Sequence, residues 1–565
     1  MAIRIAKVLI SDEIDDVCLD ILRKAEVEVV KNTNLTKEEL LQEISKYDGL
    51  IVRSATKVTA EVINAGVNLK IIGRAGTGVD NIDTDAATKR GIIVMNTPGG
   101  NTLSAAEHTC TLIIALTRNL GEASKSMKEG KWDRKRFMGT ELFGKTLAII
   151  GLGRIGKEVA LRMQSFGMTT IGFDPIIGAQ ESATFNTEWL PLEKIWTKAD
   201  YITVHTPLIP QTKNLINDAV FAKCKKGVRV INVARGGIID EDALLRALES
   251  GQCGGAGLDV FIEEPPKDYT LAKHPNVIAT PHLGASTIEA QTRVAEEIAQ
   301  QFVDLSQGKS LVGAVNAPAL THALSPASQP WVKLGERLGA VGSLLTKTLS
   351  VNNVEVLMYD ESLERAGHYL VASVMVGYLN TSAAENGDIL PKNLNLINAP
   401  VYGKHAGVKN AAENQTKEEP PCAINMISAA MVAKQAGIVT TSTYKSQVEK
   451  GRPSIKVEFQ GAGGEVVELC GTVAGDVSLL LSVQGNKFKV PACLAGDAIV
   501  YRVDKQVTLA DILQAAGKDE IEVSAVSASE VKNGQGFGII SLEYPAVKSL
   551  TNLQQVVSSA YVCAL

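Results

Sequence analysis

A glycine-rich segment in the middle of the chain has the spacing of a phosphate-binding turn. Gly151, Gly153 and Gly156 follow the apolar run TLAII and precede the helix-like run KEVALRMQSF. In such a segment the first glycine permits a tight turn, the second lets the backbone approach a pyrophosphate, and the third lets helix and strand pack closely. The amide groups at the start of the helix then point toward the phosphates. The segment therefore predicts a dinucleotide site.

A carboxylate at the end of the next predicted strand indicates which dinucleotide binds. Asp174 lies about 20 residues beyond Gly151, where a carboxylate accepts hydrogen bonds from the hydroxyl groups of the adenosine ribose. It would repel a 2′-phosphate, so the sequence favours NAD over NADP as the cofactor. A Gly-x-Gly-x-x-Gly match alone is as often a glycine-rich turn without a ligand, and it is the strand, the helix and Asp174 together that favour the nucleotide site.

Three residues of complementary chemistry follow three predicted strand ends, namely Arg235, Glu264 and His282. Because a bound dinucleotide would accept a hydride, oxidation of an alcohol beside it requires a base for the hydroxyl proton and a cation for the developing carbonyl. Arg235 can hold a carboxylate through two parallel hydrogen bonds. His282 can carry the proton, and Glu264 would favour its imidazolium form. Each residue alone has an ordinary structural explanation, but their shared position at the carboxyl edge of one sheet favours an active site.

The elements that must position these residues alternate between β-rich and helical runs. In the first hundred residues, strands expected at 7–11, 49–53, 70–73 and 92–95 indicate a small parallel α/β lobe. Ser104 and Glu107 have the spacing of a capping box, which predicts that a helix begins at Ser104 and runs through Leu116. Six further strands suit a doubly wound dinucleotide fold. They are expected at 146–150, 169–173, 201–205, 229–233, 255–260 and 276–280.

After the sixth of these strands the pattern of expected strands and helices changes. A helix-like segment from about Ser286 to Leu305 follows the sixth of these strands, and we assign it to the first lobe. Beyond residue 319 the chain is rich in β-like runs, and the segment 403–421, with one Val and no Leu, Ile or aromatic residue, is expected to be a mobile loop. The last segment, 496–565, has the pattern strand, helix, strand, strand, helix, strand.

We therefore predict an α/β fold class with two Rossmann-like parallel-sheet lobes. A discontinuous substrate-binding lobe and an NAD-binding lobe are followed by a β-rich intervening domain and a C-terminal α+β domain. At about 150 residues per domain, the 565 residues correspond to about four domains. The predicted boundaries are residues 1–98 with 288–318, then 99–287, 319–495 and 496–565.

Charge and composition exclude several classes of protein. The chain has 57 Lys and Arg against 62 Asp and Glu, a formal net charge of −5, and 5% aromatic residues. Neither a nucleic acid nor a membrane surface is therefore expected as a partner. No apolar run reaches the about 18 residues of a membrane-spanning helix. The 8 cysteines form no C-x-x-C pair, so we expect no metal site, no disulfide framework, and a reducing, cytoplasmic location.

Taken together, these motifs resemble the D-isomer-specific 2-hydroxyacid dehydrogenases. The resemblance is carried by GLGRIG, Asp174-Pro175, VHTP, NVARGG, Asp240, LDVF, EEPP and PHLGAST. The segments IVRSATKVT, GRAGTGVDNID and SMKEGKWDRKRFMGTEL, with the long C-terminal extension, further resemble the animal-type members of this family that act on 3-phospho-D-glycerate. The resemblance is dense over residues 5–316 and thinner afterwards.

The resemblance implies an enzyme that oxidises 3-phospho-D-glycerate to 3-phosphohydroxypyruvate with NAD, the first step of the phosphorylated route to L-serine. It places hydride loss at C2 of the substrate and the catalytic set at Arg235, Glu264 and His282, with His282 as the base. The NAD-binding residues that it implies are Thr77, Gly151, Gly153, Arg154, Ile155, Gly156, Asp174, Thr206, Val233, Ala234, Asp259, Gly284 and Ala285.

A phosphorylated substrate needs more positive charge than a lactate-like one. The candidate substrate-binding residues are Arg53, Ser54, Lys57, Arg74, Gly76, Asn101 and Arg134. Arg134 matches a family residue that reaches the neighbouring subunit's site, so the resemblance implies a homo-oligomer, at least a dimer, with the Ser104 to Leu116 helix in its interface. A tetramer is the expected assembly.

The extension is expected to end in an ACT-like regulatory domain, which senses serine in bacterial members of the family. The turn that would hold the effector reads RVDKQV at 502–507 and lacks the Asn or Asp followed by Pro-Gly of those members, which argues against serine feedback. Two alternatives to the implied function stay open. The chain could act on unphosphorylated 2-hydroxy acids, which need only Arg235 and His282. It could also be an NAD-sensing, corepressor-like binding protein, an option that the phosphate-suited cations and the β-rich extension disfavour.

Overall fold

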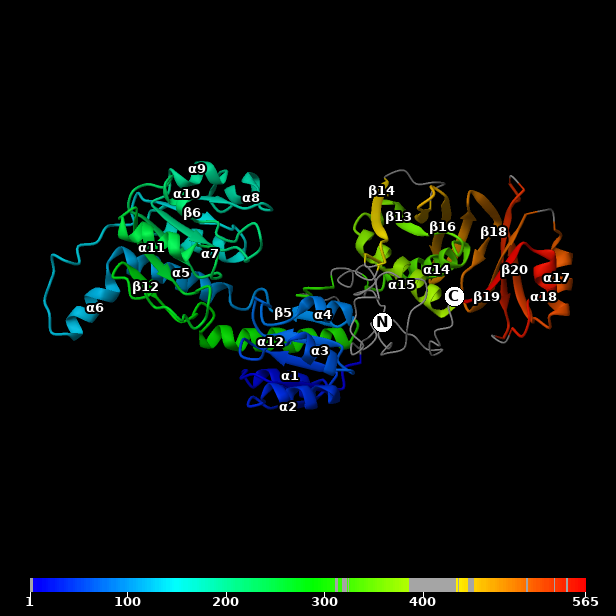
Figure 1. The fold of residues 1–565 in the computed structure, drawn as a ribbon, viewed down its shortest axis with the longest axis horizontal. Helices are drawn as coiled ribbons and strands as arrows, with labels where there is room; N and C mark the ends of the chain where they lie inside the picture. Colours follow the sequence, from blue (N-terminus) through cyan, green and yellow to red (C-terminus); the bar gives the residue numbers. More distant parts are fainter. Residues whose placement is uncertain are drawn as a thin grey trace. The chain divides into compact units, whose positions relative to one another are not determined.

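The computed structural model divides into two compact units, whose elements are labelled in Figure 1. Unit 1 comprises Met1–Asn96 and Ile298–Leu565, and unit 2 comprises Thr97–Glu297. Unit 2 is thus inserted in the sequence of unit 1. The structure describes residues 4–309, 313–317, 323, 325–385, 433–434, 436–445, 452–504, 507–532, 534–544 and 547–565.

The first part of unit 1 is a five-stranded parallel sheet in the order β2-β1-β3-β4-β5. The sequence predicted four of these strands and missed β2, whose side chains are partly exposed. Phe302 packs on the sheet so closely that a Cβ on Gly49 would lie 2.8 Å from its ring. The elements are β1 (Lys7–Ile10), α1 (Val17–Lys24), β2 (Glu28–Lys31), α2 (Lys37–Glu43), β3 (Gly49–Val52), α3 (Ala60–Ala65), β4 (Ile71–Arg74), α4 (Thr84–Lys89), β5 (Ile93–Asn96) and α12 (Ile288–Ser306), the last shared with unit 2.

Unit 2 is built on a seven-stranded parallel sheet in the order β12-β11-β10-β9-β6-β7-β8. The six strands predicted from the sequence are present, and the two-residue β8 is added at one edge. The direction of winding reverses between β6 and β9, which is where ligands of such sheets bind. The strands are β6 (Thr146–Ile150), β7 (Thr169–Phe173), β8 (Glu188–Trp189), β9 (Tyr201–Val204), β10 (Val228–Asn232), β11 (Cys253–Leu258) and β12 (Val277–Ala279), and the helices are α5 (Thr102–Thr117), α6 (Leu120–Lys128), α7 (Arg154–Gln164), α8 (Ala179–Ala183), α9 (Leu192–Trp196), α10 (Asp218–Phe221) and α11 (Glu241–Glu249).

Helix α5 begins three residues earlier than the predicted capping box implied. Its N-cap is Asn101, so Ser104 lies inside the first turn. The Ser104 hydroxyl lies 2.7 Å from the hydroxyl of Thr287, and it is therefore used in a tertiary contact rather than as a cap. The predicted capping box was wrong for this reason, although the helix itself ends at Thr117, one residue beyond the expected Leu116.

The second part of unit 1 contains a six-stranded mixed sheet in the order β14-β13-β15-β16-β17-β18. β13 and β14 are parallel, and the other neighbours are antiparallel. The sequence indicated a β-rich region but not its two long helices, and the segment 403–421 lies outside the described residues. The elements are α14 (Gln329–Leu345), β13 (Val351–Tyr359), α15 (Gly367–Glu385), β14 (Val439–Lys445), β15 (Ser454–Gly461), β16 (Val466–Ala474), β17 (Val477–Val483) and β18 (Asn486–Cys493).

The chain ends in a four-stranded antiparallel sheet in the order β20-β21-β19-β22. Its elements follow the β-α-β-β-α-β order expected from the sequence, whereas the ACT-like identity of this domain stays a prediction. No helix within the described ranges has the length and hydrophobicity needed to cross a membrane. The elements are β19 (Asp497–Val503), α17 (Leu509–Lys518), β20 (Val523–Ala528), β21 (Gly536–Leu542), α18 (Thr551–Val556) and β22 (Ser559–Ala564).

Candidate active site

The glycine-rich segment forms the turn between β6 and α7. Gly151 has a φ of +98°, and a Cβ there would lie 2.4 Å from the carbonyl oxygen of His205. A Cβ on Gly156 would lie 2.0 Å from the carbonyl oxygen of Gly151. Gly153, the N-cap of α7, has open space where its Cβ would be, with no atom within 4 Å. The outer glycines are therefore required by packing, and the middle one leaves room at a helix N-terminus, as a pyrophosphate needs.

Asp174 lies beside this turn and is held there by backbone amides. Its Oδ2 accepts a hydrogen bond of 2.9 Å from the amide of Leu152. Its Oδ1 accepts from the amides of Ile176 and Ile177 at 2.8 and 2.9 Å. The carboxylate is thus fixed next to the glycine turn, at the position where the hydroxyl groups of an adenosine ribose would be bound.

A buried hydroxyl without a partner lies on the other side of the glycine turn. Thr206 Oγ1 is inaccessible to solvent and has no hydrogen-bond partner among the described residues. The same side chain borders Gly151, since its Cγ2 would lie 3.1 Å from a Cβ there. Arg154 and Ile155 open α7, and the guanidinium of Arg154 donates to the carbonyl oxygen of Pro98. The open glycine turn, the fixed carboxylate and the unsatisfied hydroxyl together fit a dinucleotide.

Glu264 and His282 are brought together directly. Nδ1 of His282 lies 2.7 Å from Oε2 of Glu264, and Oε1 of Glu264 accepts from the amide of Phe261 at 3.1 Å. Because a carboxylate can only accept, Nδ1 carries a proton, and a neutral His282 keeps the lone pair of Nε2 free. The pair can therefore take up a proton at Nε2.

The electrostatics of the pair favour its ion-paired form. The hydrogen bond from Glu264 raises the pKa of His282 above its ordinary value, against the effect of burial. The charges of Glu264 and Asp259 act in the same direction, and the charge of Arg235 opposes them. Burial alone would raise the pKa of Glu264, but its hydrogen bond and charge interaction with His282 hold that pKa below its ordinary value.

Arg235 follows β10 and is near enough to His282 for its charge to affect the histidine. Asn232 fixes the turn by donating to the carbonyl oxygen of Arg235 at 2.8 Å, and the guanidinium donates to the carbonyl oxygen of Ala234 at 2.7 Å. Val233 meets the loop after β12, since a Cβ on Gly284 would lie 2.9 Å from Val233 Cγ1. The carbonyl oxygen of Ala285, next in that loop, accepts from Gln291.

Asp259, expected at the cofactor site, is fully buried at the end of β11. Its carboxylate binds the amides of Leu283 and Gly284, each at 2.7 Å. Its observed contacts are therefore with the loop that carries His282. Two residues that the sequence reasoning missed, His108 and Thr280, contact this carboxylate. No local motif marked either of them.

Unit 1 contains most of the candidate substrate residues and one residue of the cofactor set. The substrate candidates are Arg53, Ser54, Lys57, Arg74 and Gly76, and the cofactor residue is Thr77. Arg74 is the last residue of β4 and is paired with Val52 at the end of β3, and the other residues of this set follow these two strands. The amide of Arg53 donates to Asp12 at 2.6 Å, and the guanidinium of Arg74 donates to the carbonyl oxygen of Gly78. Ser54 and Lys57 are exposed. These residues therefore share the carboxyl edge of the five-stranded sheet.

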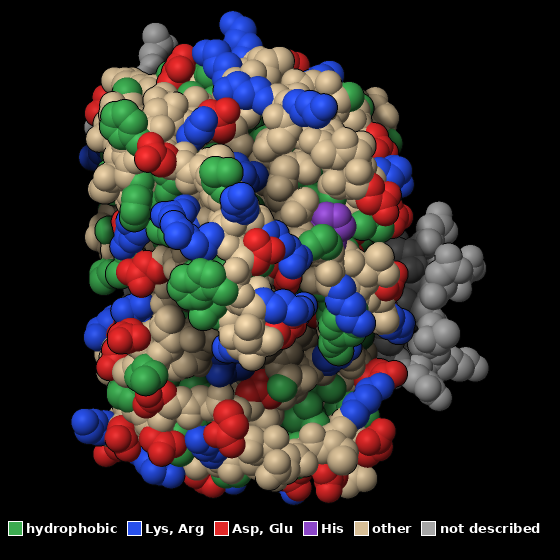
Figure 2. Space-filling model, turned by 90° about the vertical axis from the view of Figure 1, so that its left-hand side faces the viewer, with side chains coloured by type: hydrophobic (Ala, Val, Ile, Leu, Met, Phe, Trp, Pro, Cys, Tyr) green, Lys and Arg blue, Asp and Glu red, His purple; other side chains and the backbone are tan. Residues whose placement is uncertain are grey.

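The other two substrate candidates belong to unit 2. Asn101 occupies the N-cap position of α5 without a side-chain capping hydrogen bond, and Arg134 is exposed in the segment after α6. Large apolar side chains in the same part of the chain are also exposed, including Trp132 at 77%, Met138 at 82% and Phe143 at 79%. Figure 2 views the side of unit 2 on which α6 lies in Figure 1, and it shows hydrophobic, basic and acidic side chains interspersed on that face.

Comparisons with known proteins agree with this geometry. Residues 110–284 match a family model described as the NAD binding domain of D-isomer specific 2-hydroxyacid dehydrogenases. Among solved structures, a glyoxylate reductase from Paecilomyes thermophila has a TM-score of 0.51 and 29% identity, over 55% of this chain and 98% of that one. The two-lobed part of the chain thus has the fold of these enzymes.

Curated relatives extend the match into the remainder of the chain. The D-3-phosphoglycerate dehydrogenase of Homo sapiens is 57% identical over 417 residues, which are 74% of this chain and 76% of the human one. That of Rattus norvegicus is 46% identical over 559 residues, which are 98% of each chain. The chain, its C-terminal extension included, therefore belongs to the D-3-phosphoglycerate dehydrogenases of the D-isomer specific 2-hydroxyacid dehydrogenase family.

Proposed function

We propose that the protein oxidises 3-phospho-D-glycerate to 3-phosphohydroxypyruvate with NAD, opening the phosphorylated route to L-serine. The observation that carries the chemistry is the contact of 2.7 Å between Glu264 and His282, with Arg235 near enough to affect the pKa of His282. The substrate follows from membership of a group whose curated members are named for 3-phosphoglycerate.

In this proposal each side chain has one task. NAD, held by the Gly151 to Gly156 turn and Asp174, supplies the hydride acceptor. Nε2 of His282 takes the proton of the C2 hydroxyl group, while Glu264 stabilises the resulting imidazolium and keeps the ring oriented. Arg235 binds the substrate carboxylate and polarises the adjacent carbonyl as it forms. Because only neutral His282 accepts the proton, oxidation is expected to accelerate as the pH rises through its raised pKa.

The phosphate group is assigned to the cations at the edge of the five-stranded sheet, Arg53, Lys57 and Arg74, with Arg134 supplied by a neighbouring subunit. Arg53 is the sharpest test, because its Nε is shielded from solvent and has no hydrogen-bond partner within the described ranges. An anionic ligand would supply the acceptor that this donor lacks.

The test compares NADH formation from 3-phospho-D-glycerate, D-glycerate and D-lactate by wild type, Arg53→Ala and, as control, Lys37→Ala. Lys37 is an exposed cation of the same lobe paired with Glu61. We expect Arg53→Ala to lose activity only toward the phosphorylated acid and Lys37→Ala to lose none. Equal loss toward all acids would contradict the assignment, and turnover of the plain acids alone would favour the alternative substrate class.

We further propose that the active protein is a homo-oligomer, at least a dimer. Support comes from the exposed apolar and basic side chains of the segment after α6, where Trp132 and Phe143 would be buried by a second copy. Sedimentation at micromolar concentration should give a dimer or a tetramer. A fully active monomer would contradict the assignment of Arg134 to a neighbouring site.

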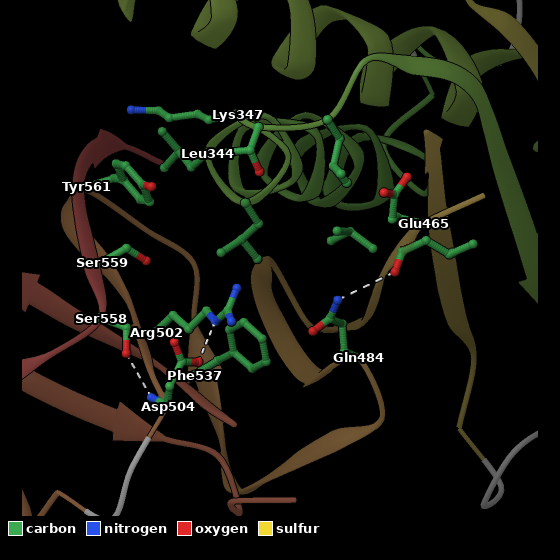
Figure 3. Close-up of a pocket in the computed structure, with 15 residues that line it drawn as sticks. Leu344, Lys347, Glu465, Gln484, Arg502, Asp504, Phe537, Ser558, Ser559 and Tyr561 are labelled. Atoms are coloured by element: carbon green, nitrogen blue, oxygen red, sulfur yellow. Dashed lines mark hydrogen bonds and ion pairs between the residues drawn. The ribbon is translucent and has the colours of Figure 1, made fainter. Parts of the chain in front are cut away.

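The domains after residue 319 are proposed to serve oligomerisation and regulation. A pocket of about 310 Å³ lies where the end of α14, the start of β16 and the turn after β17 meet the terminal sheet (Figure 3). In it, Nζ of Lys347 lies 3.9 Å from the ring centroid of Tyr561, and Nε of Arg502 is bonded to Asp504 at 2.8 Å. Glu465 also lines the pocket, so the lining contains two cations and two carboxylates. Because these charges balance, the pocket favours neither an anionic nor a cationic ligand.

A cytoplasmic location completes the proposal. Cys18, Cys110, Cys224 and Cys253 are buried free cysteines, as is usual in a reducing compartment. Burial raises the pKa of Cys18 and that of Cys253 to about 12, so neither is poised to react.

A further inference from the structure

A shielded histidine behind the candidate active site contacts the residues that shape the loop of His282. His108 projects from α5, and its Nε2 lies 3.0 Å from Oγ1 of Thr280 and 3.2 Å from Oδ1 of Asp259. The side chain of His108 is 18% exposed, and that of Asp259 is fully buried. This polar cluster therefore lies between the long helix and the ends of β11 and β12.

The direction of the hydrogen bonds in this cluster follows from the chemistry of its members. Burial would raise the pKa of Asp259, but hydrogen bonds from His108, Thr280 and two amides hold it below its ordinary value, so the group is a carboxylate. Thr280 must give its single hydroxyl hydrogen to Oδ1, at 2.6 Å. Toward His108 it can then only accept, which places a proton on Nε2 of His108. His108 thus donates toward Thr280 and toward Oδ1 of Asp259, and Thr280 donates to the same carboxylate oxygen.

The other side of Asp259 holds the active-site loop. Its two carboxylate oxygens accept from the amides of Leu283 and Gly284, each at 2.7 Å. The amide of His282 donates to the carbonyl oxygens of Asp259 and Thr280 at 2.9 and 3.0 Å. His282 has a φ of +55°, a left-handed conformation that is unfavourable for a residue other than glycine. The hydrogen bonds around Asp259 therefore compensate for a strained backbone at the candidate base.

We propose that His108 is a positioning residue for His282. Its Nε2 proton, through Thr280 and Asp259, holds the loop 282–284 in the conformation in which Nδ1 of His282 meets Glu264. The inference rests on the proposed function for the role of His282, whereas the hydrogen-bond chain itself is independent of the substrate. Residue 108 thereby becomes part of the machinery of the reaction although it touches neither substrate nor cofactor.

The test uses two substitutions in the full-length chain and one control. His108→Leu removes the donor, and His108→Gln keeps an N–H group at a similar reach. Thr111→Val changes an exposed residue of the same helix whose hydroxyl bonds only to the carbonyl oxygen of Glu107. Hydrogen exchange of the amides of residues 282–284 is measured by mass spectrometry, together with kcat and KM for 3-phospho-D-glycerate.

We expect His108→Leu to speed exchange at residues 282–284 and to lower kcat about tenfold with little change in KM, since Arg235 still binds the carboxylate. His108→Gln should restore both to within about twofold, and Thr111→Val should match wild type. Wild-type exchange in His108→Leu, or equally faster exchange throughout unit 2, would overturn the proposal. A protein that does not turn over 3-phospho-D-glycerate would refute the proposed function instead, and the exchange measurement would still decide the role of His108.

Discussion

The substitution Glu264→Gln tests the proposed base most directly, because it removes a charge and keeps an acceptor of the same size opposite Nδ1 of His282. A hydrogen bond to a charged group contributes about 1.5–3 kcal/mol. The side chain of His282 is 49% exposed and that of Glu264 is 36% exposed. Screening by solvent therefore reduces the part of this free energy that depends on the negative charge of Glu264 to about 1 kcal/mol. Since His282 becomes an imidazolium when it takes the proton, kcat for oxidation should fall about fivefold at alkaline pH.

The same substitution should also shift the pH dependence of the reaction in a defined direction. Glu264 raises the pKa of His282, and oxidation needs neutral His282, so wild-type oxidation is lost as the pH falls through that raised pKa. In Glu264→Gln the pKa of His282 should be lower than in the wild type, so the oxidation rate should fall off at a lower pH than in the wild type. Reduction needs the protonated ring and is lost as the pH rises through the same pKa. That loss should therefore also occur at a lower pH than in the wild type.

Initial rates of NADH formation and consumption across a pH series measure both effects. Glu263→Gln is the matched control, because Glu263 is the neighbouring carboxylate and pairs with Lys267 instead. It should leave both pH profiles unchanged. A folded Glu264→Gln protein whose acid limb is unmoved, or moved to higher pH, would refute the assignment of His282 as the base.

Two further predictions concern the nucleotide turn and the extension. Gly153→Ala should keep the wild-type Tm, because its Cβ meets open space, yet weaken NAD binding at least about tenfold in calorimetry, because the methyl group takes the place of the pyrophosphate. Gly156→Ala should in addition lose about 1–3 kcal/mol of stability, since its Cβ would meet the carbonyl oxygen of Gly151, and equal melting of the two variants would contradict this. Burial raises the pKa of Glu336 to about 7, whereas an unfolded glutamate titrates near about 4.3, so the folded chain should lose stability as the pH rises between these values. Glu336→Gln should then raise Tm at pH about 8 more than at pH about 5, and an equal shift at both would refute the buried acid.

The sequence predicted the central strands of the two parallel sheets, whose residues are buried on both faces. Strands such as β6 and β9 are continuous apolar runs, because helices cover both sides of a parallel sheet. β2 and β8 were missed because their side chains are partly exposed and their hydrophobic signal is weak. The start of α5 was misplaced because Ser104 had the right spacing for a cap but is used by Thr287.

The candidate site likewise has a part that the sequence predicted and a part that it did not. The glycine turn and Asp174 could be read from local spacing, because one strand, one turn and one helix build them. The contact between His108 and Thr280 joins residues 172 positions apart in sequence. Nothing along the chain records which face of α5 meets the end of β12, so only the three-dimensional structure reveals the support behind His282.

The insertion of unit 2 within unit 1 also bears on how the chain is made. Ile298 and Phe302 pack against Gly73 of the first sheet, but the ribosome releases them only after the whole of unit 2. At about 5–20 residues per second, the about 200 intervening residues take roughly 10–40 s to synthesise. During that interval unit 2 can fold as a unit, while the nascent first sheet still waits for the helix that covers it. Because of this order, we expect chaperones to bind the five-stranded sheet during synthesis. If the ribosome stalls within unit 2, the apolar face of that sheet stays uncovered.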